Sequence, residues 1–287
     1  IVTGKNPGQT GIFDFVTRDP ETYLPKLSLY EESRSKTGRT RYTRTLGAPT
    51  LWEMTSEAGI PTIVIRWPHT FPAEKINGNM FSGLGTVDVK GLMNSYRFYT
   101  SNPDVKRGEG SEKVTVVGIE SGTAETHISG PKVTKDGDAL TVPMSIEIRG
   151  SGVTLSIQGK RYEVKAGNWS EWIRIKFSAG LFQSVYGILK VRLISTQPTL
   201  SMYMTSVQID PAHPIAEISY TPGYAKELAE EIGLYYTLGM PEDTKAASRC
   251  SPSSSSAVRV GWRNWKSSLS WRCSVRPATA SRKRSTT

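Results

Sequence analysis

Between residues 153 and 204 the sequence alternates apolar and polar side chains in one short segment after another. The apolar members of this series are Val153, Leu155, Ile157, Tyr162, Val164, Ile173, Ile175, Phe177, Leu189, Val191, Leu193, Leu200, Met202 and Met204. A period of two with one polar face is typical of half-buried antiparallel strands, and the turn sequences KDGD, RGSG, QGKR and KAGN favour hairpins. We therefore predict that residues 109–210 form a β-rich antiparallel subdomain of the sandwich or barrel type, with its lysines and arginines on the solvated face.

The sequence before this region has the pattern of an α/β unit. In APTLWEMTSEAGIPTIVIRWPHTFP, residues 48–72, the spacing of Leu51, Met54 and Ala58 predicts one face of a helix that starts near Pro49 and ends at Gly59. The run PTIVIRW that follows predicts a strand buried on both faces of a parallel sheet. A helix, a glycine and a strand make half of a crossover unit, so residues 1–108 are predicted to be part of an α/β core.

A helical pattern returns after residue 210. Its apolar stripe consists of Tyr224, Leu228 and Ile232, with Ala225 and Ala229 beside it and Gly233 as the stop. We interpret this stripe as core rather than as a partner site, and we predict a second helix from about Pro241. Residues 211–245 are thus predicted to return to the α/β core, which makes the β-rich segment an insertion.

The net charge of +10 suggests a nucleic-acid partner until the chain is divided. Nine of the 36 Lys and Arg residues, none of the 26 Asp and Glu residues and both cysteines, Cys250 and Cys273, lie in residues 246–287. The first 245 residues therefore carry 27 basic and 26 acidic side chains, a net charge of +1. A basic surface of the kind that binds nucleic acid is not predicted for them.

The Ser- and Arg-rich stretch 246–287 has three interpretations. It is an out-of-frame translation of a GC-rich gene, a disordered basic extension, or an RNA-binding tail with Trp262, Trp265 and Trp271 stacking between arginines. The sudden loss of every acidic residue, together with the gain of Ser, Arg, Cys and Trp, favours the frame error, with disorder second. Nucleic acid is accordingly not the expected partner.

Several other classes of protein are disfavoured by what the sequence lacks. No run of about 18 apolar residues occurs, so no membrane partner is expected; Val2 to Thr10 is turn-forming rather than a signal-peptide core, which leaves the compartment open with a slight preference for the cytoplasm. GKNPGQTG lacks the P-loop spacing, SGLGTVDVKG lacks the third glycine of a dinucleotide fingerprint, and no GxSxG elbow occurs. The three histidines are scattered singly, without the spacing of a metal site.

The turn after the predicted strand 61–67 holds the candidate binding residues. Ligands of such sheets collect beyond the carboxyl ends of the strands, where Arg66, Trp67 and His69 lie. His69 either contacts a phosphate or metal, or is a turn histidine bonded to backbone, and the second interpretation is the one we favour.

Four segments in order resemble one known family. TGKNPGQTGIFDF, LWEMTSEAGIPTIVIRWPHTFP, FSGLGTVDV and ISYTPGYAKELAEEIGLYYTLGMPEDT are together similar to the type I phosphodiesterase/nucleotide pyrophosphatase-like branch of the alkaline phosphatase superfamily, whose members include phosphohydrolases and phosphomutases. The resemblance covers residues 1 to about 245, including the β-rich insertion with VKAGNWSEW. It implies a partial alkaline-phosphatase-like α/β core that carries this insertion.

The resemblance also implies where the catalytic groups belong. The nucleophilic Thr or Ser of the family precedes the segment that begins TG, so it is expected before Ile1, and no catalytic residue is assigned to this chain. Thr3, Gly4, Asn6, Pro7, Gly8, Gly11 and Asp14 match the family turn. Thr10 stands where relatives have His, and Phe15 stands where nucleotide pyrophosphatases carry a phosphate-binding Asn. Asp14, Arg66 and His69 remain as candidate substrate-binding residues.

The intact family enzyme uses two divalent metals, commonly zinc, that polarise the phosphoryl oxygens and activate the hydroxyl nucleophile. Its DxxDxxxH-like and SDHG-like ligand segments do not occur in this sequence, so we expect no metal site and no turnover of a phosphate mono- or diester by these residues. A rival prediction is a non-catalytic binding module for carbohydrate or a protein surface, with Trp169, Trp172 and Tyr186 as its aromatic platform.

Overall fold

The computed structural model describes residues 2–34, 40–93, 95–105, 114–134, 137–179 and 183–239. Strands dominate these residues, sheets are small, and helices are few. The strand-rich character predicted from the alternation is therefore confirmed. The helix predicted from Pro241 and the basic stretch 246–287 lie outside the described residues.

The chain begins with a one-turn helix and two small hairpins. In α1 (Pro7–Thr10) the Asn6 side chain accepts a hydrogen bond from the Gln9 amide at 3.1 Å, and Gly11 closes the turn with φ of 74°. The strands that follow pair antiparallel as β1 (Val16–Arg18) with β2 (Pro25–Leu27) and β3 (Tyr30–Arg34) with β4 (Thr40–Arg44). The sequence NPGQTG thus forms the turn that its composition predicts.

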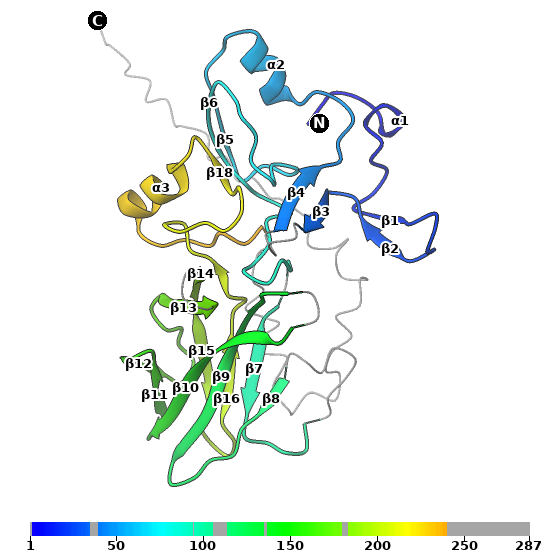
Figure 1. Ribbon diagram of the computed structural model, residues 1–287. Helices are drawn as coiled ribbons and strands as arrows, with labels where there is room; N and C mark the ends of the chain where they lie inside the picture. Colours follow the sequence, from blue (N-terminus) through cyan, green and yellow to red (C-terminus); the bar gives the residue numbers. More distant parts are fainter. Residues whose placement is uncertain are drawn as a thin grey trace, which may run out of the picture.

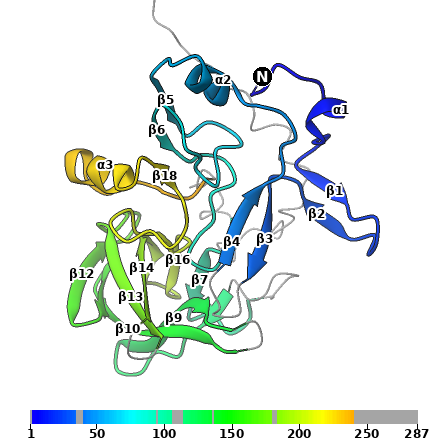
Figure 2. The same ribbon diagram turned by 45° about the horizontal axis from the view of Figure 1, so that its top comes forward.

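The predicted helix–glycine–strand unit is present. Helix α2 (Leu51–Glu57) begins at Thr50 and is followed by Gly59 with φ of 71° and by β5 (Thr62–Ile65). Strand β5 pairs parallel with β6 (Gly78–Phe81), and β6 pairs antiparallel with the short β18 (Ser219–Tyr220), in the sheet order β18-β6-β5. In both views these elements lie at one end of the molecule, with α2 near the N-terminal segment (Figures 1 and 2).

The burial predicted for this unit is wrong in two places. Strand β5 is an edge strand and not a strand buried on both faces, because Ile63 and Ile65 are 68% and 55% exposed and only Val64 between them is buried. In α2 the predicted apolar face, Leu51 and Met54, is exposed, while the helix buries the side chain of Trp52. The spacing of apolar residues identified the elements correctly but not the side that packs.

The strand-rich part contains three antiparallel or mixed sheets. One sheet has the order β12-β11-β10-β9, the second β15-β16-β7-β8 and the third β13-β14-β17. The bounds of their strands are β7 Arg97–Thr100, β8 Val114–Val116, β9 Thr123–Lys132, β10 Ala139–Arg149, β11 Gly152–Ile157, β12 Lys160–Lys165, β13 Ile173–Ala179, β14 Gln183–Leu189, β15 Val191–Ser195, β16 Ser201–Met204 and β17 Gln208–Ile209. Strand β7 precedes residue 109, the predicted start of the β-rich segment, and yet it pairs with β16. The domain boundaries remain a prediction.

The hairpins follow the turn chemistry that the sequence predicts. Strands β11 and β12 close with Ile157 opposite Lys160, so Gln158 and Gly159 form a two-residue turn with φ of 47° and 76°. Two positive φ angles in succession are the signature of a type I′ turn, whose twist matches the flanking strands. Strands β10 and β11 also close through a two-residue turn, with Arg149 opposite Gly152, and in this turn Gly150 has φ of 60°.

The alternating apolar residues meet in one core that extends across these sheets. Its fully buried side chains include Ile128, Met144, Ile146, Leu155, Ile173, Phe177, Leu193 and Met202. Arg174 and Lys176, which alternate with buried neighbours in β13, face solvent as predicted. The same core continues into Leu29, Phe71 and Phe81, so the strand-rich part and the first hundred residues share apolar packing.

Helix α3 (Tyr224–Ile232) ends before Gly233, which has φ of 80°, as predicted. The prediction that its apolar stripe is core is wrong at Ile232, which is 70% exposed, whereas Tyr224 and Leu228 pack partly against the core and Ala225 is buried. Within the described ranges, none of the helices has the length and apolar character that crossing a bilayer requires.

Candidate functional site

The turn after β5 carries two of the predicted binding residues in an unusual backbone conformation. Arg66 and His69 have φ of 52° and 62°, in the left-handed region that side chains with a Cβ seldom adopt. The strand end after β6 holds this turn in place, because the Ser82 hydroxyl donates to the Thr70 carbonyl at 2.6 Å and the Gly83 amide donates to the Thr70 hydroxyl at 2.7 Å. Left-handed residues held by their surroundings occur often at binding sites.

The side chain of Arg66 holds another part of the chain rather than facing an open site. Its guanidinium donates to the carbonyl of Tyr236 and, at 3.0 Å, to the carbonyl of Leu238. Burial lowers the pKa of this guanidinium, with a smaller opposing effect from Tyr235. Arg66 therefore fixes residues 234–239 beside the end of β5. A phosphate could be contacted only by those N–H groups of Arg66 that do not bind Tyr236 or Leu238.

His69 lies between the N-terminal segment and the β5 turn. Its imidazole stacks on the Phe15 ring with 6.1 Å between centroids and 13° between planes. Burial, followed by the positive charge of Arg44, lowers the pKa of His69, so the ring is neutral at neutral pH. Its Nδ1 atom is buried and has no hydrogen-bond partner among the described residues. The favoured interpretation, a turn histidine bonded to backbone, is therefore wrong for Nδ1.

Asp14 is exposed and uses its carboxylate locally. Its Oδ1 accepts a hydrogen bond from the Phe15 amide at 2.7 Å. Because Phe15 stacks on His69, the structure brings the segment of Asp14 next to His69. Arg66, in contrast, points to residues 236–238, so the three predicted residues do not converge on one point.

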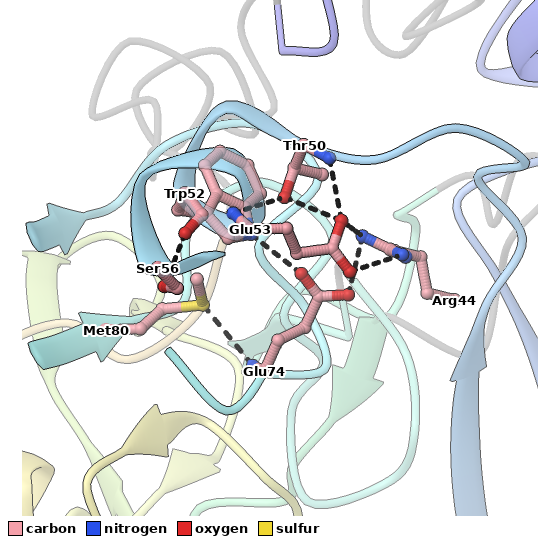
Figure 3. Close-up of polar contacts among 7 residues, drawn as sticks. All are labelled: Arg44, Thr50, Trp52, Glu53, Ser56, Glu74 and Met80. Atoms are coloured by element: carbon pink, nitrogen blue, oxygen red, sulfur yellow. Dashed lines mark hydrogen bonds and ion pairs between the residues drawn. The ribbon is translucent and has the colours of Figure 1, made fainter. Parts of the chain in front are cut away.

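A charged network beside this turn was missed by the sequence analysis (Figure 3). Arg44, from β4, contacts Glu53 of α2 through two hydrogen bonds of 3.0 and 3.1 Å and contacts Glu74 at 2.8 Å. Glu74 also accepts a hydrogen bond from the Trp52 indole at 2.7 Å. The three charged side chains are 17–31% exposed, so the network is largely shielded from water.

The environment moves the pKa values of the two carboxyl groups in opposite directions. Burial raises the pKa of Glu74 more than the Trp52 hydrogen bond and the Arg44 charge lower it. For Glu53 burial also acts upward, but hydrogen bonds from Arg44 and from Thr50 outweigh it and the pKa is lowered. Arg44 therefore occupies the space between the two carboxylates and links β4, α2 and the loop at residue 74.

Part of this network had a signal in the sequence. Thr50 and Glu53 form a capping box, in which the Glu53 amide donates to the Thr50 hydroxyl at 3.3 Å and the Thr50 amide donates to Glu53 at 2.7 Å. A Thr followed three residues later by a Glu before an apolar run is the motif that predicts it. The distant partners, Arg44 and Glu74, have no such local signal.

The described residues do not fit the two-metal centre that the resemblance implies for an intact enzyme. Across the described ranges, no three His, Cys, Asp or Glu side chains group as metal ligands. The carboxylate pair beside the turn, Glu53 and Glu74, is already bridged by Arg44. These residues are therefore given no role in a metal-dependent step. The expected lack of a metal site remains a prediction, which a metal titration tests.

The three rings of the predicted aromatic platform have different partners. The distances between ring centroids are 5.9 Å for Trp169 and Tyr203, 4.9 Å for Trp172 and Tyr236, and 4.4 Å for Tyr186 and His213. The distances from a cationic group to the ring centroid are 6.0 Å for Arg192 and Trp169, 5.0 Å for Lys190 and Trp172, and 5.6 Å for Lys176 and Tyr186. Each ring is thus already paired with a second ring and with a cation. A sugar that stacked on any of them would have to displace one of these contacts.

No protein-family model, curated protein or solved structure matches this chain. Function is therefore argued from the residues described above.

Proposed function

We propose that this chain supplies the substrate-binding side of a phosphate-ester hydrolase that resembles the alkaline phosphatase superfamily, and that these 287 residues bind the ester without turning it over. In this proposal residues of the α2–β5–β6 unit belong to a partial alkaline-phosphatase-like core. The nucleophile and the divalent metals of the reaction are supplied by groups other than the described residues.

The observation that carries the proposal is the contact between Phe15 and His69. It joins the segment that resembles the turn after the family nucleophile to the turn beyond the carboxyl end of β5, where ligands of such sheets bind. Two backbone hydrogen bonds attach the same N-terminal segment to α2 and to the residues before it: Leu51 N donates to the Val2 carbonyl at 2.8 Å, and Gly47 N donates to the Thr10 carbonyl at 2.9 Å.

The chemistry near His69 suits a phosphate ester as ligand. A neutral, partly buried imidazole offers a hydrogen bond to a phosphoryl oxygen. The guanidinium of Arg44 adds a positive charge next to it, although Glu53 and Glu74 neutralise that charge in part. The expected binding is consequently weak and depends on the geometry of the turn more than on charge.

One experiment tests both halves of the proposal. The purified chain is titrated with zinc and assayed with p-nitrophenyl phosphate, while the three histidine Cε1–H signals are followed by NMR. We expect no hydrolysis of the ester and fewer than one bound zinc ion per chain. We also expect a saturable shift of the His69 signal as the ester is added.

The signal of His127, an exposed residue on β9, is the internal control. Stoichiometric zinc with turnover would show that the chain is an enzyme by itself. A His69 signal that does not move, or that moves no more than the His127 signal, would contradict the binding role.

A further inference from the structure

The outer face of β13 and β14 carries a compact group of basic and aromatic side chains that the phosphohydrolase proposal does not use. Arg174 and Lys176 are same-face neighbours on β13, and Tyr186 on β14 lies directly opposite Lys176. His213, from the turn after β17, stacks on the Tyr186 ring with 4.4 Å between centroids. Asp210 lies beneath them and completes the group, which we name the β13–β14 cluster.

Asp210 organises this cluster from below. Its carboxylate is almost fully buried and lies 3.7 Å from Arg174 Nε and 3.9 Å from His213 Nδ1. The same residue shapes the turn, since its Oδ1 accepts from the Ala212 amide at 2.9 Å and its carbonyl accepts from the His213 amide at 3.0 Å. One buried acid thus faces Nε of the guanidinium and Nδ1 of the imidazole.

The opposite ends of these two side chains remain accessible. The side chains of Arg174 and His213 are 52% and 55% exposed, and Lys176 is exposed beside them. With Nε directed at Asp210, the two terminal nitrogens of Arg174 are its outer donors, and Nε2 is the ring nitrogen of His213 that does not face Asp210. The ammonium of Lys176 lies 5.6 Å from the centre of the Tyr186 ring, which limits the positions of its flexible stem.

The Tyr186 ring has a structural use here that makes it a poor stacking surface. It contacts His213 and Lys176 and therefore orients these two side chains rather than presenting a free face to a sugar or a base. Successive same-face residues of a strand are about 7 Å apart, so Arg174 and Lys176 reach one small anion from two sides. Arg174, Lys176 and Asp210 together carry a net charge of +1 at neutral pH, so the cluster is positive.

We propose that the β13–β14 cluster is a binding site for the phosphate group of a small phosphate monoester. Arg174 supplies a planar two-donor fork and Lys176 a point charge, a combination that suits a dianion with several acceptor oxygens, and the His213 ring lies beside them as the reporter of binding. Asp210 is a positioning residue that touches no ligand and holds Arg174 and His213. The site stands on residues other than Arg66, His69 and Asp14 and is independent of the proposed function.

The test uses the full chain and methyl phosphate as the probe at pH 7.5. Because the chain has three histidines, NMR can follow His213, His69 and His127 separately. We expect a saturable shift of the His213 signal, and a loss of affinity of at least about tenfold in Arg174→Gln/Lys176→Gln, which removes two charge-assisted contacts. Asp210→Asn should weaken binding less and should move the unliganded His213 signal, because it removes only the group that orients Arg174 and the His213 ring.

The matched control is Arg161→Gln/Lys165→Gln, which removes the same charge from exposed positions of β12. It should leave the methyl phosphate affinity unchanged. Equal weakening by both double variants, or no shift of the His213 signal, would overturn the site, because binding would then follow net charge or not occur. An equal response to acetate would overturn its assignment to phosphate. A response of His69 without one of His213 would support the proposed function and contradict this site.

Discussion

Replacing Arg44 by methionine tests the network that joins β4, α2 and the loop at residue 74. The change removes three charge-assisted contacts of 2.8, 3.0 and 3.1 Å and leaves Glu53 and Glu74 facing each other without a cation. Breaking a fully buried ion pair from one side is destabilising by about 3–5 kcal/mol. Because these side chains are 17–31% exposed, we expect a smaller decrease in the free energy of unfolding, about 2–3 kcal/mol.

Urea unfolding followed by tryptophan fluorescence measures this decrease. Two further variants show whether the cause is the unpaired charge. Lys26→Met breaks an exposed pair, Lys26–Glu31 at 3.2 Å, and should change stability by only about 0.5 kcal/mol or less. The triple variant Arg44→Met/Glu53→Gln/Glu74→Gln should recover most of the loss, since it removes the uncompensated carboxylates. A loss in Arg44→Met no larger than that in Lys26→Met, or a triple variant less stable than the single one, would refute this reasoning.

The pH dependence of the network has opposite signs for its two carboxyl groups. The lowered pKa of Glu53 means that its ionised form stabilises the fold above the unfolded pKa and that this contribution is lost as the pH falls through the folded value. The raised pKa of Glu74 means that its ionisation opposes folding as the pH rises past the ordinary glutamate value of about 4.3. The difference between wild type and Arg44→Met should therefore shrink in acid, when both carboxyl groups are protonated.

Three other results are expected. Gly130→Ala should destabilise by about 1–3 kcal/mol in urea unfolding, because the added Cβ would lie 2.4 Å from ring atoms of Phe177, whereas Gly118→Ala, with no atom within 4 Å, should be neutral or slightly stabilising. In an NMR titration His69 should have a pKa below the ordinary imidazole value of about 6.5. Because the unfolded chain then takes up a proton more readily than the folded one, stability should fall as the pH drops from about 6.5 toward the lowered pKa. Ile65→Thr, at an exposed edge position, should raise solubility in a precipitation assay while changing stability by about 0.5 kcal/mol or less.

The strand-rich half of the fold was predictable because its information is local. Each strand alternates with a period of two, and its hairpins carry their own turn residues, such as Gln158 and Gly159. Register then follows, since a shift of one residue would move every apolar side chain to the solvent face. The positions of α2, β5 and α3 were predictable for a similar reason, because Pro49, Gly59 and Gly233 mark where the two helices begin or end.

The burial of α2 and β5 could not be predicted, because the side on which an element packs is decided by residues far away in the sequence. Trp52 is the buried residue of α2 since its indole N–H has a partner in Glu74, 22 residues later. In β5 only Val64 is covered, because Ile63 and Ile65 point to the opposite face of the strand and that face is exposed. Of the candidate site, the sequence identified the turn after β5 but not the contact of His69 with Phe15, nor that Arg66 turns toward residues 236–238.

The small size of the apolar cluster around α2 explains why a polar network matters at this end of the molecule. Its buried residues are Trp52, Val64, Ile76 and Met80, and they form a cluster separate from the large core of the strand-rich sheets. Four side chains bury little area, so the contacts of Arg44 should form a large part of the local stability. Arg44→Met should accordingly increase amide hydrogen exchange in α2 and β5 more than in β10 and β11. A uniform increase across both sets of amides would show instead that the two clusters unfold as one unit.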